Sequence, residues 1–344
     1  MYVDIITGTE SVETLKEEWA LLLVKTSQNN LFLTWEWIFS WCQNMLEPNQ
    51  HPFIITAREN DRLIGLAPLV RVQNEHSEWF IQFLGQSYSY HLGFIVESGH
   101  EEQILTAIWE YLLNGIGVVC TALEFLHLDE NVRFESGLKT QAVKKGLRIE
   151  RSIYNTCKVL ELPSSFEEYL RSGISSRNLK QNLKKDSSRL KREYHVEFFQ
   201  ADMSDIPHYW SEMLKLHRQM MQMRNRHSAL TGNSFPAHLK QVADMFHKKQ
   251  ALHLSVMKVN KETAAVLLGV IYNNVYNALT MAVDQMLIRK MPWLNFVVYM
   301  QVNCIKSAIE EGCRQFDFLG GHHDYKYKLG GKDKAGIKIS VFVR

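Results

Sequence analysis

Apolar residues recur along the chain with helical or strand spacing, and the order of these segments in the first half returns in the second. In the first half the spacing predicts helices at Ser11–Val24, Trp35–Met45 and Glu101–Leu113, and strands at Phe53–Ala57, Leu63–Val72, Glu78–Leu84, Leu123–Leu128 and Asn155–Leu162. In the second half it predicts helices at Ile206–Met223, Phe235–Lys248 and Leu294–Glu311, and strands at Leu252–Val259, Ala264–Tyr272, Tyr276–Val283, Gln315–Leu319 and Ile337–Val343.

Each half therefore has the order helix, helix, three meandering strands, helix, strand, strand. This order predicts an α/β fold with two tandem domains, each a mixed, mostly antiparallel sheet flanked by helices. A helix-start signal, Ser164-Ser165 followed by Glu167 and Glu168, comes directly after the predicted strand that ends at Leu162. We place the domain boundary there, with a first domain at 1–162 and a second at 163–344.

The composition agrees with two soluble domains and narrows the function classes. A length of 344 residues with 46% hydrophobic and 22% charged residues is typical of a globular protein with two cores. Lys plus Arg (39) nearly balances Asp plus Glu (37), so the molecule as a whole is not built to clamp a polyanion. The five cysteines include no C-x-x-C pair, which argues against a disulfide framework and against a structural zinc site.

The N-terminal residues lack the basic and long apolar regions of a secretory signal. The longest apolar runs, such as Ala20–Val24 and Phe296–Met300, are much shorter than the roughly 20 residues that a membrane span needs. The sequence thus predicts a soluble, cytoplasmic protein without a membrane span.

One local segment departs from the neutral charge balance. Arg177–Arg192 carries seven basic residues and one acid, Asp186, together with three leucines at helical spacing. A basic amphipathic helix of this kind can bind tRNA or an anionic membrane surface. The alternative is a solvated helix face, which the near-neutral total charge favours.

A second segment, Asp317–Lys328, gathers groups that suit acid–base chemistry. Asp317 lies near the end of a predicted strand, and two glycines then allow a turn before His323, Tyr325 and Lys326. A tyrosine can protonate a leaving thiolate, and a histidine can accept an amine proton near neutral pH. The alternative is a basic loop that only packs its rings. We expect no metal here, because adjacent side chains of His-His-Asp on an extended segment point apart and no helical ligand pair accompanies them.

The order of elements resembles the GNAT superfamily of N-acetyltransferases, and its tandem form resembles the Fem-like transferases. The closer resemblance is to BioF2-like and CelD-like acetyltransferases. The motifs that carry it are Phe32-Leu33-Thr34-Trp35-Glu36-Trp37, Gly65-Leu66-Ala67-Pro68-Leu69, the basic helix Ser176–Glu193, Leu216-His217 and the segment Phe316–Gly331. The chain departs from the family at Trp293, where the family usually has glycine, and at His323, where it usually has an acid.

The resemblance implies two tandem GNAT-like domains, of which the second is catalytic and donor-binding and the first structural or substrate-shaping. It implies an N-acyltransferase that uses acetyl-CoA or another acyl-CoA, without metal, on a small-molecule or peptide amine. The catalytic residues it implies are His217, Asp317, His323, Tyr325 and Lys326. His217 is otherwise a structural residue in the middle of a helix.

The resemblance also places the donor's pyrophosphate at the start of the helix that we expect to begin near Pro292. Arg289, Lys290, Pro292 and Asn295 are the donor-binding residues that this implies, although Arg289 and Lys290 are otherwise solvated loop charges. Two other function classes remain open. One is a Fem-like transferase that takes its acyl group from aminoacyl-tRNA bound by Arg177–Arg192, and the other is a non-catalytic binding protein with a GNAT fold.

Overall fold

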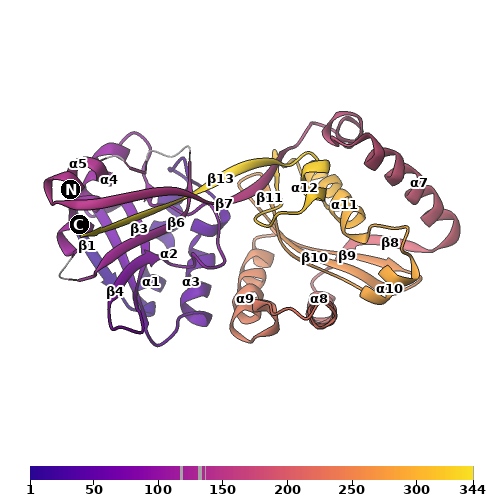
Figure 1. The fold of residues 1–344 in the computed structure, drawn as a ribbon, viewed down its shortest axis with the longest axis horizontal. Helices are drawn as coiled ribbons and strands as arrows, with labels where there is room; N and C mark the ends of the chain where they lie inside the picture. The colour runs from indigo at the N-terminus through magenta and orange to yellow at the C-terminus, as the bar shows by residue number, and fades with distance from the viewer. Residues whose placement is uncertain (117–118, 131–133, 136, 344) are drawn as a thin grey trace. The chain divides into compact units, whose positions relative to one another are not determined.

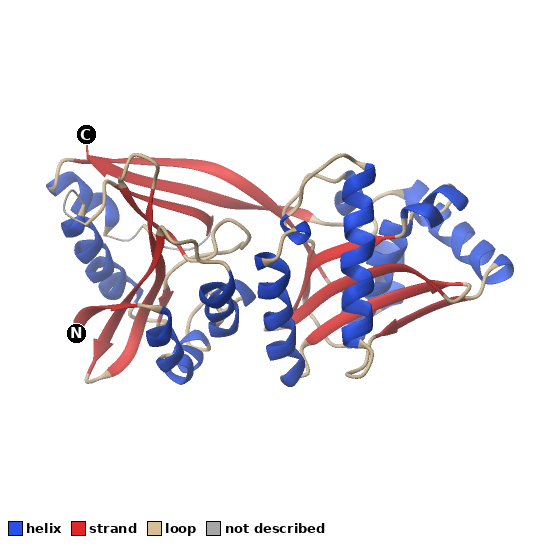
Figure 2. Cartoon of the chain, turned by 90° about the horizontal axis from the view of Figure 1, so that it is seen from below, coloured by secondary structure: helices blue, strands red, loops and turns tan. Residues whose placement is uncertain are grey.

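The computed structural model describes residues 1–116, 119–130, 134–135 and 137–343. The chain forms two compact units (Figures 1 and 2). Unit 1 comprises Met1–Thr156 and Lys334–Arg344, and unit 2 comprises Cys157–Asp333. Among the described residues, no helix combines the length and the apolar character that a bilayer crossing requires.

Unit 1 is a mixed sheet with the strand order β1-β2-β3-β4-β6-β13-β7. From β1 to β13 its pairs are antiparallel except β4 with β6, which are parallel. Its strands are β1 (Tyr2–Thr7), β2 (Gln50–Glu59), β3 (Arg62–Gln73), β4 (Trp79–Phe83), β5 (Ile95–Val96, paired with β3), β6 (Ala122–Asp129), the part of β7 (Leu147–Glu161) up to Thr156 and the later part of β13 (Lys332–Val343). Its helices are α1 (Thr9–Thr14), α2 (Lys16–Leu23), η1 (Leu31–Leu33), α3 (Trp35–Asn44), α4 (Glu101–Gly115) and α5 (Leu138–Lys144).

The core of unit 1 is built from rings on several elements. Phe83, Phe94, Trp109, Phe125 and Phe134 have ring centroids 4.4 to 5.9 Å apart. Five of these contacts are edge-to-face, a geometry that stabilises a core beyond the burial of its area.

Unit 2 contains mixed strands in the order β7-β12-β11-β10-β9-β8, of which β7 also has residues in unit 1. Its strands are the last residues of β7 (Leu147–Glu161), then β8 (Val196–Gln200), β9 (Leu252–Val259), β10 (Glu262–Tyr272), β11 (Val275–Val283) and β12 (Gln315–Asp317). Its helices are α6 (Phe166–Glu168), η2 (Tyr169–Gly173), α7 (Arg177–Glu193), α8 (Ile206–Met223), η3 (Ala229–Thr231), α9 (Ser234–Lys248), α10 (Gln285–Lys290), α11 (Phe296–Glu310) and α12 (Asp324–Lys328).

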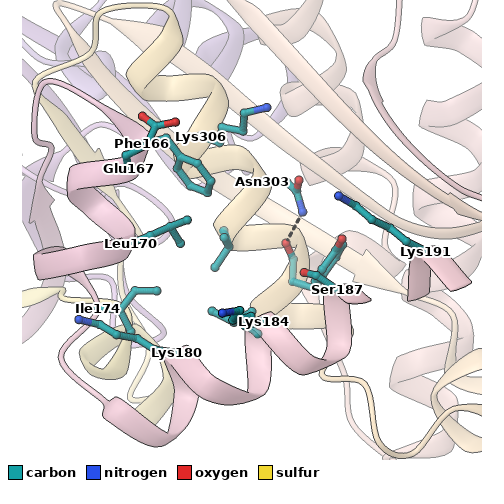
Figure 3. Close-up of a pocket in the computed structure, with 13 residues that line it drawn as sticks. Phe166, Glu167, Leu170, Ile174, Lys180, Lys184, Ser187, Lys191, Asn303 and Lys306 are labelled. Carbon is teal, nitrogen blue, oxygen red and sulfur yellow. Dashed lines mark hydrogen bonds between the residues drawn. The ribbon is translucent and has the colours of Figure 1, made fainter. Parts of the chain in front are cut away.

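The helices of unit 2 lie on both faces of its sheet. Figure 1 shows α8 and α9 against one face and α11 against the other, and in Figure 2 α8 and α9 lie in front of the strands. The basic helix α7 lies outside α11, and a pocket opens between α7 and α11 (Figure 3). The predicted α/β class, with mixed strands flanked by helices, is confirmed, as is the basic helix. The strands do not form two separate sheets, because β13 neighbours β7 and β7 has residues in both units.

Two strands differ from the prediction in the sheet that they join. Asn155–Leu162 was expected to close the first sheet, but Val159–Glu161 of β7 pair with β12 in unit 2. Ile337–Val343 was expected to close the second sheet, but residues of β13 from Gly336 to Phe342 pair with β6 in unit 1. The apolar pattern shows that these segments are buried strands, but pairing is a long-range choice that the pattern of one strand does not encode.

The division of the chain into units therefore differs from the predicted one, which placed the boundary at Leu162-Pro163. Unit 2 begins at Cys157, six residues before the predicted start at 163 and within β7, and unit 1 includes the segment from Lys334 onward. Unit 1 thus includes a strand from the end of the chain that the order of the halves assigns to the second sheet, and β7 contributes residues to both units.

Candidate functional site

The sheet of unit 2 opens between its two parallel strands. β11 and β12 pair only at Val275, Tyr276 and Asn277, opposite Gln315, Phe316 and Asp317. β11 then continues to Val283 along β10, whereas β12 ends at Asp317. In the described part of the chain no strand pairs with residues 278–283 on that side. An opening beyond the carboxyl ends of parallel strands is a usual place for a ligand in an α/β sheet.

Two buried polar side chains mark the point where the strands part. Asn277 and Asp317 lie opposite each other in the register and are 5% and 3% exposed. The Asn277 amide nitrogen donates to the carbonyl oxygens of Val270 (3.2 Å) and Val275 (3.1 Å). The Asp317 carboxylate accepts the amide of Leu319 at 2.7 Å. Asp317 therefore shapes the turn that follows β12.

A bulge in β11, with Leu279 as its extra residue, lies beside this point. The β10–β11 register shifts between Leu268 and Gly269, and a Cβ at Gly269 would lie 2.5 Å from the Tyr276 ring. Tyr276 in turn stacks on Phe316 with centroids 4.8 Å apart and an interplanar angle of 8°. The small residue and the two stacked rings fix the ends of β11 and β12 at the opening.

The turn after β12 is held by Lys326, which is 4% exposed. Its Nζ donates to the carbonyl oxygens of Phe318 (2.9 Å) and Leu319 (3.2 Å) and to that of Gly320. Leu319 and Gly321 both have positive φ, of 56° and 96°, so the turn is tight. Burial lowers the pKa of Lys326 to about 8, against the opposing effect of Asp317. The Lys326 ammonium is therefore still mainly charged at pH 7, and its hydrogen bonds to three carbonyl groups hold the turn in place.

His323 and Tyr325 form the outer side of the same segment. Their rings stack with centroids 5.8 Å apart and an interplanar angle of 22°. Burial raises the pKa of Tyr325 to about 12, so the phenol stays protonated at neutral pH. Burial, and then the charge of Lys326, lowers the pKa of the exposed His323, so its imidazole is neutral and able to accept a proton.

His217 lies on α8 and is buried. Its Nε2 shares a hydrogen bond with Ser228 Oγ at 2.9 Å, and its Nδ1 is buried with no hydrogen-bond partner. Burial lowers its pKa, and Arg224 adds to the shift. Arg224 also lowers the pKa of His323, so the end of α8 and the segment around α12 share one electrostatic environment.

The predicted donor residues follow the carboxyl end of β11. Arg289 and Lys290 form the last turn of α10, which Asp284 caps by accepting the amides of Met286 and Leu287. The predicted helix start near Pro292 is wrong. Pro292 lies in the link between two helices, because α10 ends at Lys290 and α11 begins at Phe296 with Asn295 as its N-cap. The Asn295 side chain accepts the amide of Val298 at 3.1 Å.

The structure also accounts for Trp293. The guanidinium of Arg189 lies 4.1 Å from the centre of its indole, and the ring of Tyr194 is 6.3 Å away. Trp293 thus anchors the basic helix α7, a role that the sequence did not indicate.

The sequence missed three polar residues of this region. Arg224 and Ser228 were not singled out because only the fold of the segment after α8 brings them to His217. Asn277 lay unnoticed inside an apolar strand, although a polar residue at a buried strand position is itself a signal.

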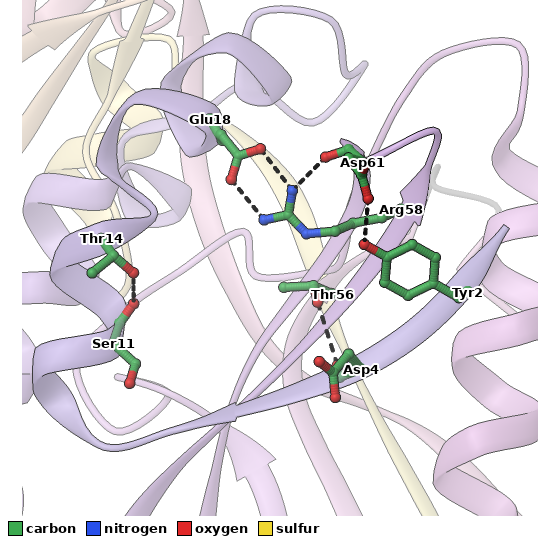
Figure 4. Close-up of polar contacts among 8 residues, drawn as sticks. All are labelled: Tyr2, Asp4, Ser11, Thr14, Glu18, Thr56, Arg58 and Asp61. Carbon is green, nitrogen blue, oxygen red and sulfur yellow. Dashed lines mark hydrogen bonds and ion pairs between the residues drawn. The ribbon is translucent and has the colours of Figure 1, made fainter.

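A group of polar contacts in unit 1 holds its elements together at one edge of the sheet. Arg58 donates to both carboxylate oxygens of Glu18 (2.7 and 2.6 Å) and to the carbonyl oxygen of Asp61, and Tyr2 donates to the Asp61 carboxylate (Figure 4). These bonds join β1, α2 and the β2–β3 hairpin at the edge of the sheet.

Residues 177–327 match a family model described as Acetyltransferase (GNAT) domain. The chain carries a GNAT domain. The matched residues include the opening between β11 and β12, α11 and most of α12, and the family description indicates an acyltransferase. Among proteins with curated descriptions, no match was found.

Solved structures show the same fold over the whole chain. FemX has a TM-score of 0.67 at 11% identity, covering 100% of this chain and 98% of its own. The structure of L-PGS from Bacillus licheniformis has a TM-score of 0.53 at 11% identity, covering 94% and 90%. A tandem GNAT protein from the clavulanic acid biosynthesis pathway has a TM-score of 0.50 at 10% identity, covering 99% and 98%. The fold of the chain is thus a tandem GNAT fold, with the family match in unit 2.

Proposed function

We propose that the protein is an N-acyltransferase that moves an acyl group from an acyl-CoA to an amine on a small molecule or peptide. Unit 2 performs the transfer, and unit 1 has a structural or substrate-shaping role. The observation that carries this proposal is the parting of β11 from β12 at Asn277 and Asp317, with His323 and Tyr325 on the segment that follows β12.

The donor would enter along the free edge of β11. Backbone groups of residues 278–283 have no partner strand there in the described chain, so they are available to an extended pantetheine arm. The pyrophosphate would lie beyond the carboxyl end of β11, near Arg289 and Lys290 and the first turn of α11. Helix amides and the helix dipole favour an anion at that place. Pro292 and Asn295 shape the link and cap the helix.

Acyl transfer to an amine requires a proton acceptor and stabilisation of the leaving thiolate. His323 is exposed and has a lowered pKa, which suits it to accept the amine proton. His217, which is buried and bonded to Ser228, is the second candidate. Tyr325, with a pKa of about 12, would stabilise a thiolate of pKa about 8.5 by donating a hydrogen bond, because complete proton transfer would be uphill.

Asp317 and Lys326 act in this proposal as positioning residues. The carboxylate holds the amide of Leu319, and the ammonium holds two further carbonyl groups of the turn besides that of Leu319. Together they fix the turn that carries His323 and Tyr325.

A second candidate donor is aminoacyl-tRNA, which α7 favours through its seven basic residues. Binding of tRNA by this helix would weaken steeply with salt, as the release of condensed counterions requires. A GNAT-fold protein that binds ligands without catalysis is the third candidate.

The proposal is tested with the full chain and a panel of acyl-CoA thioesters. We expect one of them to raise the melting temperature, since a ligand at a hundred times its Kd adds about 2.7 kcal/mol of stability. With that donor and an accepted amine, Tyr325→Phe should lower kcat about 100-fold through the lost hydrogen bond to the thiolate. His323→Ala should lower it by a similar factor and remove the acidic limb of the pH profile.

Tyr327→Phe is the matched control, because Tyr327 is on the same short helix and its hydroxyl donates to Asp333 at the surface. Its kcat should stay within about twofold of the parent chain. If charged tRNA stabilises the protein and no acyl-CoA does, the donor is aminoacyl-tRNA. Ligand binding with no transfer to any amine would favour the non-catalytic protein.

A further inference from the structure

The pocket between α7 and α11 has a chemistry that acyl transfer at the β11–β12 opening does not use. Its volume is about 750 Å³, within the range of sites that hold small ligands. Its walls come from α6 and η2, from α7 and from α11, all of them in unit 2 (Figure 3).

The lining divides into an apolar part and a charged part. The apolar part consists of Phe166, Leu170, Ile174, Leu183, Tyr299 and Val302. The charged part has four lysines, at 180, 184, 191 and 306, and a single carboxylate, Glu167. An apolar floor beneath an excess of positive charge suits an anion that carries a hydrocarbon chain.

The spacing along α7 separates two sets of cations. Lys180, Leu183, Lys184, Ser187 and Lys191 recur every three or four residues and line the pocket as one helix face. Other cations of α7 are engaged elsewhere, since Arg189 lies on Trp293 and both Arg189 and Arg192 pair with Glu193. Glu193, at the end of the helix, thus offsets part of the positive charge that does not line the pocket.

Two of the pocket lysines are available to a ligand. Lys180 donates to the carbonyl of Arg171, and Lys306 pairs with Glu310 at 3.5 Å. Lys184 and Lys191 take part in no ion pair within the described part of the chain. They lie two helical turns apart on flexible stems, roughly 10 Å along the axis, and can converge on one polyvalent anion.

We infer that this pocket binds a phosphate-bearing amphiphile with a single hydrocarbon chain, taken up as one molecule. The phosphate lies between Lys184 and Lys191, where its oxygens accept hydrogen bonds from both ammonium groups. The hydrocarbon chain of the ligand lies along Leu170 and Val302. It covers apolar surface there, including that of Leu170, which is 40% exposed. A nucleic acid backbone would use the charges of α7 but would leave this apolar floor uncovered.

Octyl phosphate, kept below its aggregation concentration, tests the inference by calorimetric titration of the full chain. Two control ligands separate the parts of the molecule: inorganic phosphate has the anion alone, and octyl glucoside has the hydrocarbon chain alone. We expect octyl phosphate to bind at least tenfold more tightly than either, because only it fills both parts of the pocket. Inorganic phosphate that binds as tightly as octyl phosphate would overturn the inference, and so would the absence of any binding heat.

The double variant Lys184→Gln, Lys191→Gln should weaken octyl phosphate binding about tenfold or more, which corresponds to about 1.4 kcal/mol. The matched control is Lys185→Gln, Arg192→Gln, which removes the same charge from residues of α7 that do not line the pocket. Its affinity should stay within about twofold of the parent. An equal loss in both double variants would show that only the general field of the helix acts, as in RNA binding, and would overturn the site.

Discussion

At the scale of single residues, the surroundings of one buried histidine in unit 1 lower its pKa strongly. His127 of unit 1 is 6% exposed and lies between the rings of Tyr90 (5.2 Å) and Tyr154 (5.0 Å). Burial, and then the neighbouring His91, lowers its pKa to about 4. Its φ of 60° is left-handed, a conformation that asparagine also adopts readily.

We expect His127 to make unit 1 sensitive to acid. Its pKa is lower in the folded state than in the unfolded state, where it is about 6.5. The unfolded chain therefore takes up the proton first as the pH falls, and stability that is present above pH 6.5 is lost progressively down to about pH 4. This loss amounts to about 3 kcal/mol.

Urea unfolding at several pH values between 7 and 4, monitored in unit 1, measures this loss. His127→Asn should lose about 3 kcal/mol less than the parent over that range. His76→Asn, which replaces an exposed histidine of the same unit, should match the parent. If His127→Asn loses as much stability as the parent, His127 is not the group that titrates.

At the scale of elements, α7 depends on a side chain from outside the helix. Ser176 caps its first turn by accepting the amide of Leu179, and only Leu190 of the helix is fully buried. A helix with so little apolar burial needs other contacts to stay docked. The indole of Trp293 under Arg189 supplies one of them.

Trp293→Ala should therefore loosen α7 while the rest of unit 2 stays folded. The variant loses a cation–π contact worth about 0.5–1 kcal/mol, together with the packing of the ring. Hydrogen exchange of the α7 amides should become at least several-fold faster, with β9 and β10 unchanged. Trp293→Phe keeps an aromatic face, so its α7 amides should exchange at a rate between those of the parent and of Trp293→Ala. Unchanged exchange of α7 in Trp293→Ala would show that the contact does not hold the helix.

The sequence predicted elements well where the apolar period is strong, and less well elsewhere. β9, β10 and α8 are long segments with a clear buried face, and they lie close to their predicted bounds. β1 and β8 were missed because both are short edge strands with few fully buried positions. The start of α11 was misplaced because Pro292 suits the first turn of a helix but also suits a link.

The candidate site was predicted in part, for a similar reason. The cluster from Asp317 to Lys326 is continuous in sequence, so its residue types could be recognised together. That the Lys326 ammonium turns inward to carbonyl groups depends on the path of the turn, which no pattern of residues gives. The same holds for the joint influence of Arg224 on His217 and His323.

At the scale of the whole molecule, unit 1 is completed by a strand from the far end of the chain. Ile337, Ile339 and Val341 of β13 are at most 2% exposed, and the strand pairs with β6. Burial of three such side chains contributes roughly 5–9 kcal/mol, which is comparable with the total stability of a domain.

A chain that ends at Asp333 should consequently lose the fold of unit 1 and keep that of unit 2. Asp333 itself remains, with its bonds to Lys158 and Tyr327. Hydrogen exchange should show loss of protection in β2, β3 and β6, with protection retained in β9 to β11. Lys338→Ala is the control, because it removes only a partly exposed ion pair with Glu124, worth at most about 1 kcal/mol. Full protection of β6 in the shortened chain would contradict the expectation.

The late position of β13 in the chain also fixes an order of events during translation. Residues of unit 1 up to Thr156 leave the ribosome first, yet their sheet lacks the strand that starts near Lys334. At about 5–20 residues per second, synthesis of the intervening unit takes roughly 10 to 35 seconds. For that period the edge of β6 is open to pairing with other nascent chains. The time for which the nascent protein is exposed to aggregation is therefore set by the length of unit 2, although the vulnerable edge belongs to unit 1.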